Sequence, residues 1–188
     1  FHTTNAGYFP GSSFAGGLIL KTNAPTRTSI QGYIGWNSID NSSAGLALNF
    51  KRKKLSFSTR AIWRMLENNY AFNDVYKVNT PRTEQEHNDT EQYGILSKLQ
   101  YEFSSATAAF VEGWYQSKDT EIPSIMGSYG EADANQQDSS LRIVGGVQHR
   151  ANNWVIDAKG GWSYEYQHFR TNQNDDGEWG VDSRMTMY

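Results

Sequence analysis

Side chains alternate between apolar and polar over residues 154–168 with few exceptions. Successive side chains of a β-strand point to opposite faces, so this pattern predicts a strand with two distinct surfaces. One surface would carry Trp154, Ile156, Ala158, Gly160, Trp162, Tyr164 and Tyr166, and the other Val155, Asp157, Lys159, Gly161, Ser163, Glu165 and Gln167. Aromatic side chains therefore begin and end the apolar surface, and the charges lie on the opposite one.

The distance between these aromatic ends matches the apolar band of an outer-membrane barrel. From Trp154 to Tyr164 a strand rises about 33 Å, and a tilt near 45° leaves roughly 23 Å along the membrane normal. Such barrels present an apolar band about 25 Å tall between two girdles of aromatic residues. A strand of a soluble sandwich, with its apolar face toward a core, fits the same segment and is the alternative.

The same alternation predicts further strands, which together indicate an all-β, antiparallel fold. The predicted strands cover residues 29–37, 44–51, 55–65, 92–103, 107–116, 141–148 and 154–168, and residues 184–188 resemble the start of an eighth. Their charged residues fall on the polar sets: Lys51, Arg60, Arg64, Lys98, Glu102, Glu112, Arg142, Asp157, Lys159 and Glu165. All of these except Lys51 and Arg142 could pair across a lumen, hold a plug in it, or simply give the lumen its ordinary polarity. Lipid on the other face would explain this placement, although a sandwich core would exclude charge as well.

Connections between the predicted strands alternate in length. Short turns at residues 52–54, 104–106 and 150–152 alternate with polar connections of more than a dozen residues at 67–91, 117–137 and 169–183. Connections of this length are uncommon in compact soluble domains, whereas outer-membrane barrels combine short periplasmic turns with long extracellular loops. We therefore favour the membrane barrel. Because residues 184–188 are too few to cross a bilayer, the chain is interpreted as part of a larger barrel.

Composition excludes several other classes. No run of apolar residues is long enough for a transmembrane helix, and the mean hydropathy of −0.70 does not argue against a barrel, in which only alternate residues face lipid. The net charge is −3 without a basic block, so we expect no nucleic-acid partner. Cysteine is absent, the four histidines are scattered, and no hydrolase or phosphate-loop motif occurs, so we expect no enzyme activity.

Two stretches resemble a known family. Residues 10–22, Pro-Gly-Ser-Ser-Phe-Ala-Gly-Gly-Leu-Ile-Leu-Lys-Thr, are similar to the end of the plug domain in TonB-dependent outer-membrane receptors. Trp114-Tyr115-Gln116 and Glu121-Ile122-Pro123 resemble the fifth strand and following loop of receptors for vitamin B12 or ferric siderophores in Bacteroidetes-type bacteria.

The resemblance implies a specific organisation and function. Residues 1–24 would end the plug, and residues 25–188 would form the first strands of a barrel of about 22 strands in the bacterial outer membrane. The protein would take up a large, scarce nutrient such as cobalamin or a ferric siderophore. Its partners would be the lipid bilayer, the TonB complex and, as in some relatives, a lipoprotein that forms a lid at the cell surface. The TonB complex would be contacted through an N-terminal region that this sequence lacks. The alternative is a structural or adhesive barrel without transport.

The resemblance implies that the ligand binds at the outer side of the membrane, so the candidate site residues are those expected to lie there. Ligand contacts would come from Asn69, Tyr70, Phe72 and Asp74 in the first long connection, from Trp114 near the outer end of its strand, and from Ile125, Met126 and Tyr129 in the second connection. Aromatic side chains suit a large flat ligand, but for any single one of them a role in the aromatic girdle or in loop packing is the simpler explanation.

Calcium is a second candidate ligand. Asp175, Asp176 and Glu178 with Asn174, or Glu131, Asp133 and Asp138, supply the oxygen ligands that calcium prefers. Neither cluster has the spacing of an EF-hand, so solvated loop acids are the alternative.

Overall fold

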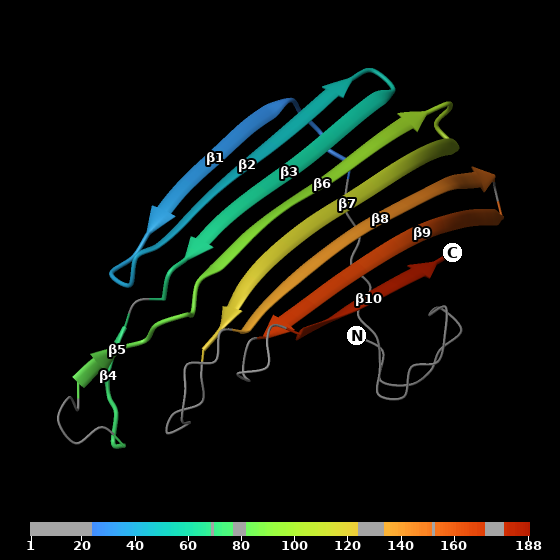
Figure 1. Ribbon diagram of the computed structural model, residues 1–188. Coiled ribbons are helices and arrows are strands. Elements are labelled where there is room, and N and C mark those ends of the chain that lie inside the picture. The colour runs from blue at the N-terminus through green and yellow to red at the C-terminus, as the bar shows by residue number, and fades with distance from the viewer. Residues whose placement is uncertain (1–23, 69, 77–81, 124–133, 152, 172–178) are drawn as a thin grey trace.

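The structure is a computed structural model that describes residues 24–68, 70–76, 82–123, 134–151, 153–171 and 179–188. These residues form one antiparallel sheet of eight strands and a separate two-stranded hairpin (Figure 1). The sheet contains β1 (Ser29–Trp36), β2 (Asn41–Arg52), β3 (Leu55–Leu66), β6 (Thr90–Glu102), β7 (Thr107–Ile122), β8 (Ala134–Ala151), β9 (Trp154–Thr171) and β10 (Trp179–Met187), and the hairpin contains β4 (Ala71–Asn73) and β5 (Arg82–Glu84). The predicted all-β antiparallel fold is confirmed.

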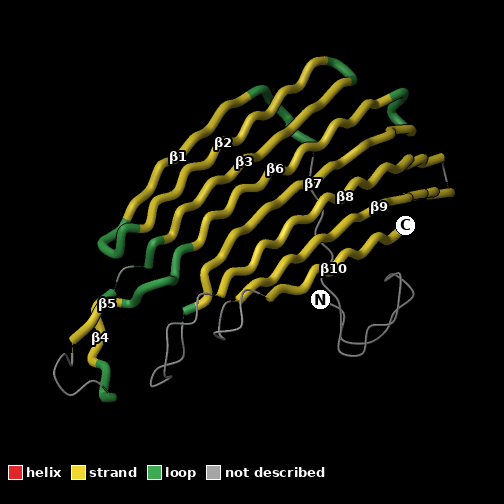
Figure 2. Tube along the Cα trace, in the orientation of Figure 1, coloured by secondary structure: helices red, strands yellow, loops and turns green. Residues whose placement is uncertain are grey.

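The strands follow one another in the sheet in chain order, β1-β2-β3-β6-β7-β8-β9-β10. Figure 2 shows them lying side by side in a single curved layer. Within the described residues β1 pairs only with β2, and β10 pairs only with β9, so the sheet is not closed into a barrel. The predicted plug segment, residues 1–24, lies almost wholly outside the described residues.

Several strands are longer than the alternation predicted. β7 continues to Ile122, β8 begins at Ala134, β9 continues to Thr171 and β10 begins at Trp179. The second and third connections therefore comprise residues 123–133 and 172–178, and the prediction that each exceeds a dozen residues was wrong. Beyond residue 116 polar side chains occupy both faces, so the alternation ends although the backbone pairing continues.

The first long connection agrees with the prediction in length but not in structure. It contains the hairpin β4–β5, where the sequence indicated no element. Figure 1 places this hairpin beyond the ends of β3 and β6.

Pairing across the sheet assigns the side chains to two faces. Residues directly opposite each other in an antiparallel pair share a face. Lys98 is opposite Ser58 and Glu112, whereas its neighbour Leu99 is opposite Phe57 and Val111. The ten charged residues predicted to share one surface do share it, and we call it the charged face; the opposite surface is the apolar face.

The apolar face is not covered by any other part of the described chain. Ile34 is 79% exposed, Ile156 is 52% exposed and Leu99 is 41% exposed, while Ala134 is the only buried hydrophobic residue among those described. On the charged face, in contrast, Ser56 and Ser58 are buried. The described residues therefore form neither an apolar core nor the two-sheet sandwich considered as the alternative. They also include no helix with the length and apolar character needed to cross a membrane.

Aromatic side chains lie near both ends of the apolar face. Trp36, Trp63, Tyr93, Tyr115 and Tyr166 lie toward the long connections, and Phe50, Phe57, Tyr101, Phe103 and Trp154 lie toward the short turns. Beyond the first group this face becomes polar, in one register row that contains Glu91, Asp119, Gln137, His168 and Asp182. Charge is thus excluded from the middle of the apolar face but not from this end.

Candidate functional site

The charged face carries ion pairs along the surface of the sheet. The Lys51 ammonium lies 2.8 Å from the Glu102 carboxylate, and the Lys98 ammonium lies 3.7 Å from Glu112. Further along the sheet, Lys159 pairs with Asp157 at 3.0 Å, and Arg142 pairs with Glu165. These pairs join positions along the open sheet, so the predicted pairing across a lumen stays a prediction, and the four pairs add no net charge to the face.

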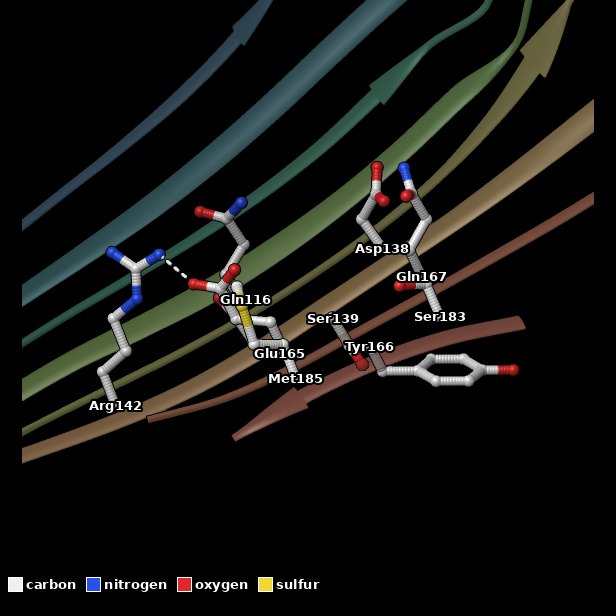
Figure 3. Close-up of a pocket in the computed structure, with 10 residues that line it drawn as sticks. Gln116, Asp138, Ser139, Arg142, Glu165, Tyr166, Gln167, Ser183 and Met185 are labelled. Carbon is white, nitrogen blue, oxygen red and sulfur yellow. Dashed lines mark hydrogen bonds and ion pairs between the residues drawn. The ribbon is translucent and has the colours of Figure 1, made fainter. Parts of the chain in front are cut away.

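A groove of about 380 Å³ is open on the charged face of the last four strands. Its polar side chains come from neighbouring strands: Gln116 from β7, Asp138 and Arg142 from β8, Glu165 and Gln167 from β9, and Ser183 from β10. Figure 3 shows the Arg142–Glu165 ion pair within this group. Amide, hydroxyl and carboxylate groups of this kind can donate and accept hydrogen bonds to a polar ligand. The sequence did not single out this groove, because it depends on the register of four strands.

Trp114 lies beside this groove, on the charged face as predicted. It is directly opposite Arg142, and the Arg142 guanidinium lies 5.2 Å from the centroid of its ring. Because β7 continues to Ile122, Trp114 is near the middle of the strand, and its predicted position at the outer end was wrong. The indole face is already partly covered by the guanidinium, as in a cation–π pair.

Two of the predicted ligand residues lie side by side where the chain enters the hairpin. The rings of Tyr70 and Phe72 have centroids 6.2 Å apart and are tilted by 52°. Tyr70 is 45% exposed, so part of this aromatic surface faces solvent. Asp74 is buried, and its Oδ1 accepts a hydrogen bond from the backbone NH of Tyr76 at 2.9 Å. Asp74 therefore stabilises the turn rather than presenting a carboxylate to a ligand.

Hydrogen bonds of asparagine side chains attach the connection that carries the hairpin to the end of the sheet. Asn41 Oδ1 accepts from the backbone NH of Asn68 at 2.9 Å, and Asn41 Nδ2 donates to Asn68 Oδ1 at 3.1 Å. Asn68 Nδ2 also donates to the carbonyl of Asn88 at 3.0 Å. The Asn68 backbone has a φ of 50°, a left-handed conformation that asparagine tolerates better than most residues.

A histidine makes a second attachment. His87 Nε2 lies 2.8 Å from the carbonyl oxygen of Ala134, and its Nδ1 lies 3.7 Å from the Glu121 carboxylate. Glu121 also accepts a hydrogen bond from the backbone NH of Asp89 at 3.1 Å. In the sequence His87 is one of four scattered histidines, and its contacts could not be predicted because Glu121 and Ala134 are distant from it in the chain.

The remaining predicted site residues are not placed by the structure. Asn69, Ile125, Met126 and Tyr129 lie outside the described residues, as do the calcium candidates Glu131, Asp133, Asn174, Asp175, Asp176 and Glu178. Asp138 is described, and both its carboxylate oxygens accept hydrogen bonds from Gln136 Nε2, at 3.1 and 2.9 Å. Over the part of the chain that is described, no group of three or more acidic or histidine side chains is arranged to hold a metal ion.

No family model matches the chain, and no curated protein matches it. The features of the chain that bear on function are therefore the two faces of the sheet and the connections at its end.

Proposed function

We propose that this chain is part of a transmembrane β-barrel in a bacterial outer membrane, and that the whole protein is a TonB-dependent transporter for a large, scarce nutrient such as cobalamin or a ferric siderophore. The observation that carries the proposal is the apolar face, which extends over eight strands, is exposed in its middle, and has aromatic side chains near both ends. Its apolar middle faces lipid in this proposal.

Burial of apolar surface supports the lipid environment. Each side chain such as Ile34 or Ile156 gains about 1.5–3 kcal/mol when it is removed from water, and the described residues offer these side chains no protein surface to pack against. A bilayer removes the whole face from water at once. A charged side chain at the bilayer midplane costs about 2–4 kcal/mol, which explains why Lys98 and Glu112 lie on the other face.

The two sheet edges support a larger barrel. In hydrocarbon every backbone NH and carbonyl must find a partner within the protein. The outer edges of β1 and β10 have none among the described residues, so a barrel built from this sheet needs further strands. The proposed lumen is lined by the charged face, as expected for a barrel that encloses water or a plug.

The transport step is supported by the resemblance of residues 10–22 to the end of a plug and by the aromatic hairpin at the end of the sheet. In this proposal Tyr70 and Phe72 meet the ligand outside the membrane, and the polar lumen passes it inward. The energy comes from the inner membrane through the TonB complex. No bond of the ligand is made or broken.

Uptake by cells tests the proposal. The full-length gene is expressed in an outer-membrane host that lacks its own receptors, and uptake of labelled cobalamin and of a labelled ferric siderophore is measured with and without functional TonB. The proposal predicts uptake of one of them that disappears without TonB. Correct insertion into the outer membrane without any TonB-dependent uptake would support the structural or adhesive barrel instead.

A further inference from the structure

Two arginines on the charged face differ from the other cations near the middle of the sheet. Lys51, Lys98, Arg142 and Lys159 each pair with a carboxylate. Within the part of the chain that the structure describes, Arg60 and Arg64 of β3 have no hydrogen-bond or ion-pair partner, and both are exposed. Among the same residues, Lys118 of β7 also has no ion-pair partner, but it is directly opposite Asp138, so among the middle strands β3 carries the unpaired cations that have no acid beside them.

Register explains why these arginines are unpaired. Arg60 is directly opposite Ala47 and Leu96, and Arg64 is directly opposite Ser43 and Gln92. The diagonal neighbours on β2 and β6 are also free of acids: Asn41, Gly45, Asn49, Thr90, Gly94 and Lys98. No carboxylate on the adjoining strands is placed to neutralise either guanidinium.

Space for a ligand lies beside Arg60. A hollow of about 340 Å³ is lined on the charged face by Gln31, Tyr33, Gly45, Ala47, Arg60 and Ile62, so Arg60 is its one charged side chain. The small side chain of Ala47 leaves room over β2, and the amide of Gln31 adds a neutral hydrogen-bond donor. Arg60 and Arg64 are four residues apart, about 13 Å along a strand, so their flexible side chains can contact separate groups of one large ligand.

We propose that Arg60 and Arg64 bind an anionic ligand, one that presents carboxylate or phosphate groups to this face. A guanidinium holds such groups by paired, charge-assisted hydrogen bonds. Arg142 already pairs with a carboxylate, whereas the guanidinium groups of Arg60 and Arg64 pair with none in the described part of the chain. The inference depends on the proposed transport function and narrows its substrate class to an anionic complex rather than a neutral one such as cobalamin.

Binding of simple anions to the full-length protein in detergent tests this site. Citrate and pyrophosphate serve as carboxylate and phosphate probes in calorimetric titrations at low ionic strength. The double variant Arg60→Gln/Arg64→Gln is compared with Lys51→Gln/Lys159→Gln, which removes the same charge from the same face but from paired positions. We expect the arginine variant to weaken binding by at least about tenfold and the lysine variant to change it by less than about twofold.

Three results would overturn the inference. Equal weakening in both variants would mean that only the overall field attracts the anion. Absence of binding by the wild-type protein, together with lower thermal stability of the arginine variant, would mean that the arginines hold another part of the polypeptide. Unchanged uptake of an anionic nutrient by the arginine variant would remove the site but leave the transport proposal intact. Conversely, arginine-dependent anion binding without TonB-dependent uptake would retain the site and remove the transport proposal.

Discussion

The ring of Tyr33 lies directly over Gly45 on the neighbouring strand, so that a β-carbon added to Gly45 would be 2.1 Å from Tyr33 Cε1. Phe110 covers Gly146 in the same way, at 2.8 Å from the equivalent position. Both pairs lie on the charged face. Aromatic rings that cover glycines of the next strand fill the space left by the missing side chain and help to fix the register.

We expect Gly45→Ala to destabilise the folded protein by about 1–3 kcal/mol, because the new methyl group overlaps the Tyr33 ring. Urea titration of the detergent-refolded protein measures this change. Gly113→Ala is the matched control, since nothing lies within 4 Å of a β-carbon at Gly113, and we expect it to be neutral or slightly stabilising. In a Tyr33→Ala background the cost of Gly45→Ala should largely disappear; a cost that persists would contradict the contact.

The two faces of β6 should respond differently to charge. Leu99→Arg places a guanidinium in the middle of the apolar face, and we expect it to cost about 2–4 kcal/mol in lipid. Gln100→Arg introduces the same charge one residue away on the charged face and should change stability by less than about 1 kcal/mol. Denaturant titration of both variants in lipid vesicles measures the difference. Equal costs would argue against lipid on the apolar face.

Loss of the Asn68 side chain should loosen the attachment of the hairpin. Asn68→Ala removes the side-chain hydrogen bonds to Asn41 and Asn88, but not the bond from the Asn68 backbone NH, and it also disfavours the left-handed backbone. Asn68→Gly removes the same side-chain bonds but tolerates this backbone conformation. We therefore expect faster amide exchange in residues 71–73 for both variants, and the larger increase for alanine. Exchange that is unchanged in Asn68→Ala would show that the hairpin is held by other contacts.

The aromatic pair on the hairpin should contribute to ligand capture. Tyr70→Ala removes the exposed ring of the pair, and we expect it to weaken binding of the transported nutrient by roughly tenfold, because exposed aromatic surface is lost at the point of first contact. Val75→Ala is the control, since Val75 is also exposed, at 81%, but its side chain has no aromatic ring. Equal affinities of the two variants, measured by equilibrium binding to cells, would exclude the hairpin from the site.

The sequence predicts the centre of the sheet better than its ends. From Lys98 to Glu102 the residues alternate in polarity, because one face carries charge and the other does not, and both the strand and its faces were correctly predicted. From Lys118 to Ile122 both faces are mostly polar, so periodicity cannot distinguish paired strand from loop. The hairpin strands β4 and β5 are only three residues each, too short to show a period.

The candidate site depends even more on long-range pairing. The position of Trp114 on the charged face followed from alternation, but its contact with Arg142 needed the register between β7 and β8. Likewise, nothing local indicates that Arg60 lacks an acidic neighbour while Lys98 has one. Partners across a sheet are separated by tens of residues, and their alignment is set by whole strands and turns rather than by the residues themselves.

The central claim is that lipid covers one face of this sheet and an aqueous lumen the other, and spin labelling tests it most directly. The chain contains no cysteine, so single cysteines can be introduced and labelled at Ile95, Leu99 and Ile143 on the apolar face and at Lys98 and Glu112 on the charged face. In outer-membrane vesicles, labels on the apolar face should collide readily with oxygen, which concentrates in hydrocarbon, and poorly with a water-soluble nickel chelate. Labels on the charged face should show low oxygen accessibility. Strong collisions with the nickel chelate at Ile95, Leu99 and Ile143 would contradict the account.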